Sequence, residues 1–273
     1  MTYKKNIFQL FLLVTTLAST LAFGIKSSSA ETIAYIKEAR ELIVCASPRA
    51  EPLSDVINII ETPKYPGIHI DIANSLAKKI NVSIKYKWID FFFRPEQVKC
   101  DVFMGIPSIT KNDPPHPFLK KSISYIRVKK LFVSLKDYNL KSIKSFKGLR
   151  VAAHTGSAVQ DILRNKNSGA ELLVSYLEDN KKLDALVRGD VDVALVTSIN
   201  LGWYKKNHPM FKPITTSTKI VAQISEYSYT LGLHKADQST VQIFNNHIAE
   251  MINDGSLKKI FEHYGVKYEM KQH

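Results

Sequence analysis

Residues 148–164 (GLRVAAHTGSAVQDILR) contain the local pattern that decides the fold, a short apolar strand followed by a turn and a helix. The apolar run Gly148–Ala153 is typical of a buried strand, Thr155-Gly156-Ser157 is typical of a turn, and a helix begins at Ala158. The alternation then continues through a strand, a helix and a strand, at Leu172–Leu177, Asn180–Arg188 and Val191–Thr197. Strands that alternate with helices predict a mostly parallel sheet with right-handed crossovers.

An earlier block of the chain has the same organisation. Glu41–Ser47 (ELIVCAS) reads as a buried strand, and apolar residues recur at helical spacing from Ile70 to Ile80. Two further strands are predicted at Val82–Ile89 and Asp101–Ile106, and the C-terminus is helical from Val241 onward. Two such blocks in one chain predict an α/β protein with two lobes.

The composition excludes several classes of protein. Hydrophobic residues make up 45% of the 273 residues, which is enough to build a core and excludes wholesale disorder. The net charge is +13, but the basic residues are spread along the whole chain, which indicates solvated faces rather than a nucleic-acid site. No long apolar stretch follows the N-terminus, so a polytopic membrane protein is excluded.

Residues 1–30 have the pattern of a secretory signal peptide. Lys4 and Lys5 precede the uncharged apolar stretch Ile7–Ile25, and Ser28-Ser29-Ala30 offers small residues for cleavage before Glu31. The sequence therefore predicts export to the periplasm. An uncleaved membrane anchor is the alternative, because the apolar stretch is long for a signal.

Export changes the interpretation of the two cysteines. Cys45 and Cys100 would meet an oxidising compartment, which favours a disulfide over two buried thiols. Neither the cysteines nor the 8 histidines show metal-ligand spacing, so we expect no metal. The chain also lacks a nucleophile elbow, a phosphate loop and a dinucleotide fingerprint, so we expect neither a cofactor nor catalysis.

Five stretches in order resemble the family 3 periplasmic solute-binding proteins of the polar amino acid type: Gly67–Leu76, Asp101–Thr110, Lys147–Ser157, Gly189–Thr197 and Asn253–Tyr264. The resemblance implies the type II fold, with two lobes joined by extended crossovers at Ile126–Leu135 and Lys219–Ile224. Residues 31–130 and 222–273 would then form lobe 1, and residues 131–221 lobe 2.

The resemblance also implies a function. A soluble, monomeric binding protein of this kind captures a small polar or anionic solute between its lobes and delivers it to an ABC permease. Two features depart from the family pattern: no Arg follows Ser108-Ile109-Thr110, and Thr197 stands where an Asp usually holds the ligand ammonium. Weak binding of ordinary α-amino acids is therefore expected, and a basic protein without acids in its cleft favours an anionic or polar ligand.

A subgroup of the family fits these departures. Cys45-Ala46-Ser47, Arg94, Lys99-Cys100-Asp101 and Leu201–Tyr204 look similar to the binding proteins associated with quinoprotein alcohol dehydrogenases. The alternative function is therefore that of a periplasmic accessory protein docking on such a dehydrogenase.

The candidate ligand-binding residues lie at strand ends and at one helix start, where open α/β folds bind ligands. They are Ser47, Arg49, Asp90, Phe92, Pro107, Ser108, Thr110, Thr155, Gly156, Ser157 and Thr197. Arg49, Ser108 and the 155–157 turn are expected to converge on one bound group. His69 is interpreted as a surface or helix-start residue.

Overall fold

The computed structural model describes residues 32–56, 66–89, 97–109, 116–154, 156–165, 168–176, 178–220 and 225–270. The predicted signal peptide and the candidate residues Asp90, Phe92, Thr110 and Thr155 lie outside these ranges. The described residues belong to one compact unit. Among them, no helix combines the length and the apolar character needed to cross a membrane.

One ten-stranded mixed sheet organises the unit, in the order β4-β1-β5-β12-β7-β10-β8-β9, with β6 beside β12 and β11 beside β7. Its first half consists of β1 (Glu41–Ala46), β4 (Ser83–Trp88), β5 (Val102–Ser108), β6 (Leu119–Lys121) and β12 (Glu226–His234). Its second half consists of β8 (Arg150–His154), β9 (Leu172–Tyr176), β10 (Val193–Thr197) and β11 (Ile214–Ser217). A separate two-stranded hairpin joins β2 (Arg49–Ala50) to β3 (Ser54–Asp55).

The strand β7 (Ile126–Ser134) is shared by the two halves. Ile126–Lys129 pair with β12, whereas Lys130–Ser134 pair with β10, both antiparallel. β1 pairs in parallel with β4 and β5, and β8 pairs in parallel with β9 and β10, whereas β5 and β12 are antiparallel. The predicted α/β class is confirmed, and the first predicted crossover is this strand.

The second predicted crossover is wrong at its start. Thr218–Ile220 form a short 3₁₀ helix, and residues 221–224 lie outside the described ranges. The Ser217 hydroxyl accepts a hydrogen bond from the Lys219 N–H at 3.3 Å, and the Thr218 hydroxyl donates to the Lys130 carbonyl. The local bond between Ser217 and the Lys219 backbone competes with an extended chain.

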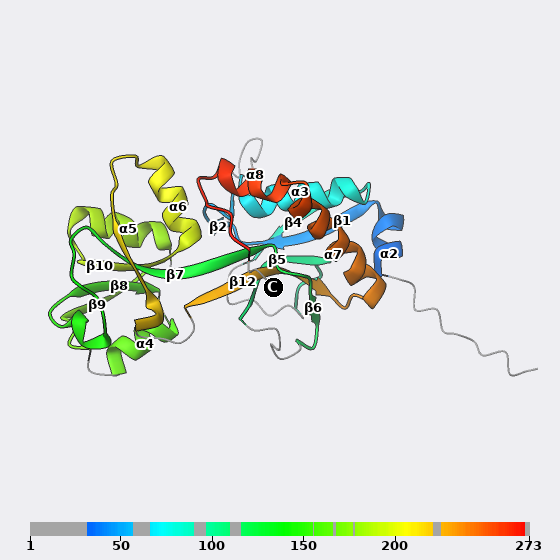
Figure 1. Ribbon diagram of the computed structural model, residues 1–273. Helices are drawn as coiled ribbons and strands as arrows, with labels where there is room; N and C mark the ends of the chain where they lie inside the picture. Colours follow the sequence, from blue (N-terminus) through cyan, green and yellow to red (C-terminus); the bar gives the residue numbers. More distant parts are fainter. Residues whose placement is uncertain are drawn as a thin grey trace, which may run out of the picture. The chain divides into compact units, whose positions relative to one another are not determined.

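Helices cover the sheet, as Figure 1 shows. Against the first half lie α2 (Thr32–Ala39), α3 (Ile68–Lys79), α7 (Gln238–Asn253) and α8 (Ser256–His263). Against the second half lie α4 (Ala158–Asn165), α5 (Asp179–Arg188) and α6 (Ser198–Asn207), together with the 3₁₀ helix η2 (Ile143–Phe146). The sequence analysis missed α6, because its apolar residues follow no clear helical period and Gly202 interrupts them.

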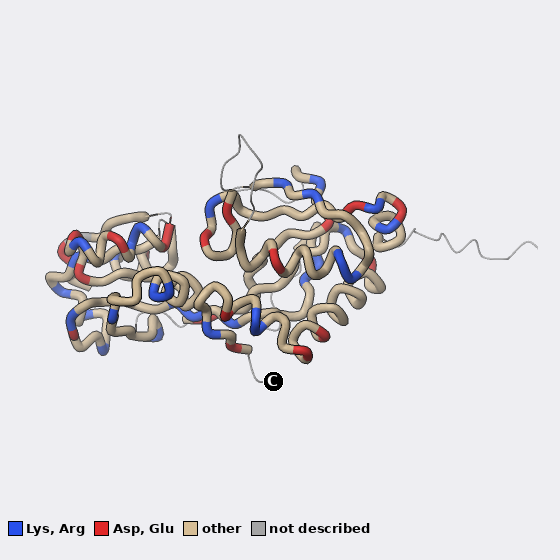
Figure 2. The backbone as a smooth tube through the Cα atoms, turned by 90° about the horizontal axis from the view of Figure 1, so that it is seen from above, with Lys and Arg blue, Asp and Glu red and all other residues tan. Residues whose placement is uncertain are grey.

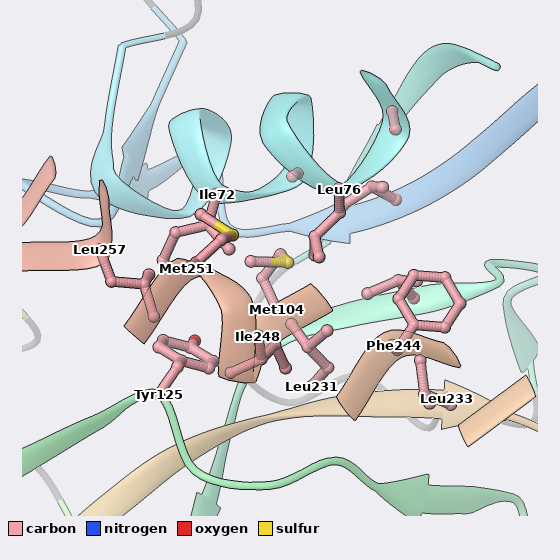
Figure 3. Close-up of a cluster of buried hydrophobic side chains, with 14 of the residues drawn as sticks. Ile72, Leu76, Met104, Tyr125, Leu231, Leu233, Phe244, Ile248, Met251 and Leu257 are labelled. Atoms are coloured by element: carbon pink, nitrogen blue, oxygen red, sulfur yellow. The ribbon is translucent and has the colours of Figure 1, made fainter. Parts of the chain in front are cut away.

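The largest core lies between the first half of the sheet and its helices. Figure 3 shows Ile72 and Leu76 of α3 facing Met104 of β5 and the α7 side chains Phe244 and Ile248. In the second half, successive residues of β10 alternate between two clusters, with Val193 and Leu195 on one face and Ala194 and Val196 on the other. This strand is buried on both faces, as parallel-sheet strands are, which explains its continuous apolar sequence.

A disulfide joins Cys45 of β1 to Cys100, whose Cα atoms lie 5.8 Å apart. Both residues belong to a small buried cluster with Phe103 and Leu119, on the sheet face opposite the main core. The favoured pairing of the cysteines is therefore confirmed. Basic and acidic positions are interspersed over the described part of the chain (Figure 2), as expected for solvated faces.

Candidate functional site

A cavity of about 300 Å³ lies between the two halves of the sheet. The first half contributes the segment that forms the β2–β3 hairpin and two tyrosines of β12. The second half contributes the end of β8, the start of α5 and the junction of β10 with α6. The lining residues are Arg49, Ala50, Glu51, Leu53, Asp55, His154, Glu178, Asp179, Asn180, Thr197, Asn200, Tyr227 and Tyr229.

Glu51 connects the two sides of the cavity. The side-chain amide of Asn180 donates to Oε2 of Glu51 at 3.1 Å. The side-chain amide of Asn200 donates to the backbone carbonyl of Glu51 at 2.7 Å. Both donors belong to helices of the second half, so the hairpin and those helices are joined at this one residue.

The wall of the second half is built at two helix starts. The Thr197 hydroxyl accepts from the Asn200 N–H at 3.2 Å and so caps α6. Asp179, in the first turn of α5, accepts from the Thr197 N–H at 3.0 Å. Its other carboxylate oxygen forms an ion pair with Lys182, whose side chain is 1% exposed. The carboxylate of Asp179 therefore lies beside Thr197, at the end of β10.

The wall of the first half is aromatic and is supported from behind by His69. The Tyr227 and Tyr229 hydroxyls lie 3.2 Å apart, and the Tyr229 ring makes an edge contact with His69. Nε2 of His69 is hydrogen-bonded to the Tyr125 hydroxyl at 2.9 Å, and that hydroxyl accepts from the Gly105 N–H. Burial lowers the pKa of His69 to about 3, so the ring is neutral at physiological pH.

His69 lies in the first turn of α3, so its interpretation as a helix-start residue is confirmed, but a surface position is wrong, since it is 4% exposed. Gly105 adopts a φ of +71°, and a Cβ there would lie 2.6 Å from the imidazole ring. The glycine thus permits this left-handed backbone conformation within β5 and leaves room for the histidine. The helical spacing of apolar residues in α3 could not predict the burial of His69. The space for its ring is provided by β5, more than 30 residues further along the chain.

Carboxylates dominate the charge of the cavity. Glu51, Asp55, Glu178 and Asp179 line it, whereas Arg49 is the cationic side chain of the lining. Burial raises the pKa of Glu51, and the neighbouring Asp55 and Glu178 raise it further, while the Asn180 hydrogen bond lowers it. The expectation of a cleft without acids is wrong, because the hairpin after β1 and the start of α5 bring acids from distant segments together.

The two-part sheet, the strand shared between its halves and the cavity between them agree with the family resemblance of the sequence. The model of the bacterial extracellular solute-binding proteins, family 3, matches residues 42–267. The chain belongs to this family. The match covers nearly all the described residues, so both halves of the sheet and the cavity lie within it.

Named relatives of this family 3 protein are amino-acid-binding proteins. It is 23% identical to the arginine-binding extracellular protein ArtP of Bacillus subtilis, over 91% of this chain and 95% of the relative. An ancestral cationic amino acid solute binding protein has the same fold, with a TM-score of 0.69 and 19% identity, covering 86% of this chain and 99% of that one. AbpA, an amino acid ABC transporter substrate-binding protein from Streptococcus pneumoniae bound to L-arginine, aligns with a TM-score of 0.64 and 19% identity, over 84% and 96% of the two chains.

Two of the residues predicted for the site of this family 3 protein line the cavity, Arg49 and Thr197. The others that the structure describes lie outside its lining. Ser47 stabilises the hairpin, since its carbonyl accepts from the Ser54 hydroxyl at 2.8 Å. Pro107 and Ser108 pair with β12.

The predicted turn before α4 is partly described. The Ser157 hydroxyl accepts from the Gln160 N–H at 3.2 Å, and the Gly156 N–H donates to the Gln160 side chain at 3.1 Å. Both groups are thus used within the helix start. Thr155 is the member of the turn outside the described residues.

The sequence analysis missed most of the lining. Glu51 and Asp55 follow a strand end closely, and this signal could have identified them as neighbours of Arg49. Nothing in the local pattern indicated Asn180, Asn200 or Tyr227. Among the described residues, no group of three or more His, Cys, Asp or Glu is arranged to hold a metal ion.

Proposed function

We propose that this protein is the substrate-binding component of an ABC transporter and that its solute is an amino acid with a positively charged side chain. The observation that carries the proposal is the cavity between the two halves of the sheet, lined by four carboxylates and bridged by Glu51. The names of the relatives, which include arginine and cationic amino acids, support the same solute class. An anionic solute fits this lining poorly, because like charges in a partly buried site repel.

The two parts of an amino acid have partners of opposite charge in the lining. Arg49 lines the cavity and can pair with the solute carboxylate. The carboxylates can receive the cationic side chain and the ammonium group. The absence of the usual Arg and Asp at their family positions then changes which residues hold the solute rather than the class of solute.

The lobes, the export and the oligomeric state are parts of the same proposal. The partner change within β7, after Lys129, supports a boundary near residue 130, with 31–130 and 222–273 as lobe 1 and 131–221 as lobe 2.

We propose that residues 1–30 are a signal peptide and that the protein works as a periplasmic monomer. The family's extracellular character supports this location. The relatives described above are transporter or amino-acid-binding proteins, and they give no support to a quinoprotein dehydrogenase partner.

Isothermal titration calorimetry with L-arginine, L-lysine, L-histidine, L-glutamine and L-glutamate tests the proposal. At least one of the three basic amino acids is expected to bind tenfold or more tightly than L-glutamate. Replacing Arg49 by Ala should weaken that binding by about 1–3 kcal/mol. Arg188→Ala is the matched control, because Arg188 pairs with Asp190 at the surface. No binding of any amino acid, or tightest binding of L-glutamate, would contradict the proposal.

A further inference from the structure

One charged side chain beside the cavity is buried and has no part in the proposed contacts with the solute. Lys182 of α5 is 1% exposed and lies outside the cavity lining. Its ammonium group forms an ion pair with Oδ1 of Asp179, which lines the cavity and is 11% exposed. Oδ2 of Asp179 accepts from the Thr197 N–H, so the carboxylate is held from two sides. Lys182 therefore acts on the cavity through Asp179.

The packing of α5 does not explain why this position is a lysine. Its neighbours Leu183 and Leu186 belong to an apolar cluster of the second half. Replacing a buried ion pair by apolar side chains of similar volume is often neutral or stabilising, so the pair is weak evidence for a role in stability. The ammonium group also reaches back to the first turn of α5, where the positive end of the helix dipole disfavours a cation. A cation placed against both local preferences is a candidate for a role in the adjacent cavity.

The charges around the cavity indicate what this role is. The four carboxylates of the lining belong to Glu51, Asp55, Glu178 and Asp179. Arg49 lies directly opposite Asp55 in the β2–β3 hairpin, and Lys182 pairs with Asp179. Two positive charges therefore face four negative ones, so a formal count that leaves His154 neutral gives two negative charges in excess. Without Lys182 the excess would be larger by one charge.

The charge of Lys182 affects cationic and neutral solutes differently. Charges in a protein interior are screened less than charges in water, so a buried ammonium group behind the lining opposes the entry of a cation. Asp179 attracts a cation less when it is paired with Lys182 than it would as an unpaired carboxylate. A neutral solute responds much less to either charge. The pair therefore changes the discrimination between solutes rather than binding in general.

We propose that Lys182 is the internal counter-ion of the cavity and that, by neutralising Asp179, it sets how strongly the cavity prefers a cationic solute over a neutral one. Lys182 is a positioning residue, since it acts through Asp179. The inference rests on the proposed function, because it concerns solute selection in the same cavity. The excess negative charge remains at Glu51 and Glu178, so the cationic group of the solute is directed toward that side of the cavity.

The test compares L-arginine with L-citrulline, which has nearly the same shape but a neutral side chain. Isothermal titration calorimetry at pH 8 measures the dissociation constants of both for the protein expressed from the full chain. The ratio of the two constants is called the charge preference here. Wild-type protein is expected to bind L-arginine at least tenfold more tightly. L-lysine and L-norleucine serve in the same way if the protein binds L-lysine instead.

Two single variants should move the charge preference in opposite directions. Lys182→Gln removes the positive charge but can still donate a hydrogen bond to Asp179, so the charge preference should rise at least fivefold. Asp179→Asn retains an acceptor for the Thr197 N–H and leaves the charge of Lys182 without a partner, so the charge preference should fall at least tenfold. A purely structural role would weaken the binding of both solutes together and leave their ratio unchanged.

A double variant and a surface control complete the set. Asp179→Asn combined with Lys182→Gln restores the wild-type charge count, so its charge preference should return to within about threefold of wild type. Asp190→Asn should behave like wild type, since Asp190 pairs with Arg188 at the surface. Circular dichroism checks the folding of each variant. If one single variant does not fold, the other carries the same test, because each changes the charge beside the cavity by one unit.

The outcomes separate this inference from the proposed function. If the single variants keep the wild-type charge preference, or shift it in the same direction, the inference is overturned and the amino-acid-binding function stands. If wild-type protein binds L-citrulline as tightly as L-arginine, the proposed solute class is contradicted, while the shifts in the variants still decide the role of Lys182. Failure of every amino acid to bind overturns both.

Discussion

The two halves of the sheet bury their faces in different ways. In the second half, both faces of β8 and β10 pack against separate apolar clusters, one with α5 and α6 and the other with α4 and η2. In the first half, one face carries the large core with α2, α3, α7 and α8. The opposite face carries the small cluster of Cys45, Cys100, Phe103 and Leu119, to which no described helix contributes.

The disulfide lies on the sheet face that no described helix covers. A sheet face covered by a helix loses apolar surface from water, and this burial is the main source of stability. The face of the first half with the small cluster buries less, and the cross-link lies on that face. We expect the covalent bond to stabilise chiefly the half of the sheet whose second face has the thinner apolar cover.

The largest effect is expected from removing the cross-link, with Cys45→Ser and Cys100→Ser together. The disulfide closes a loop of 55 residues, so chain-entropy arguments predict a loss of about 4 kcal/mol of unfolding free energy, a model-dependent value. Urea unfolding of the variant and the wild type, with unchanged slope, measures this loss.

Hydrogen exchange of the same variant tests whether the disulfide protects the first half of the sheet more than the second. Amides of β1 and β5 should lose protection by more than amides of β8 and β10. Equal loss in both halves would mean that the sheet unfolds as one cooperative unit and that the disulfide has no special role on its own face.

A smaller effect is expected at the contact between α6 and the C-terminal turn, where the halves meet. A Cβ on Gly202 would lie 2.7 Å from the Gly265 carbonyl oxygen and 3.1 Å from the Val266 Cα. Both neighbours are backbone atoms, which cannot move aside as a flexible side chain can. Gly202→Ala gains about 1 kcal/mol of helix propensity, whereas overpacking costs about 1–3 kcal/mol. We expect a net loss of up to about 2 kcal/mol, measured by urea unfolding. Lys205→Ala, exposed on the same helix, is the control, and a stabilised Gly202→Ala protein would show that α6 can move away from the turn.

The smallest effect concerns an ion pair of the second half. Nη2 of Arg150 lies 2.9 Å from Oδ1 of Asp192, and Nε of Arg150 donates to Oδ2 at 3.0 Å. These bonds hold the pKa of Asp192 at about 2, below its ordinary value. Because the folded pKa is depressed, this stabilisation is present above about pH 4 and is lost as the pH falls toward 2.

Asp192→Asn tests that pair by urea unfolding at pH 7 and pH 3. The loss at pH 7 should be on the order of 1 kcal/mol or less, because both side chains are partly exposed and solvent screens the charges. The difference between wild type and variant should shrink at pH 3. A difference that stays constant with pH would assign the effect to the hydrogen bonds rather than to the charge of Asp192.

The sequence predicted the elements whose evidence is local. The apolar runs of β1, β8 and β10 and the helical spacing of α3 and α7 depend on neighbours within a few residues, so they can be read from the chain. The α/β class follows from their order. Arg49 and Thr197 were found as candidate site residues for the same reason, since each lies at or just beyond a strand end.

The tertiary structure decided what fills the site. Glu51, Asp179 and Tyr227 come from three separate parts of the chain, and only the folding of the two halves against β7 brings them to one cavity. The acidic character of the cavity in a chain of net charge +13 is therefore invisible to composition. The burial of His69 depends likewise on the missing side chain of Gly105 in another element. Local sequence specifies secondary structure through short-range sterics and periodicity, whereas the charge and shape of a cavity depend on distant residues whose positions only the packed fold determines.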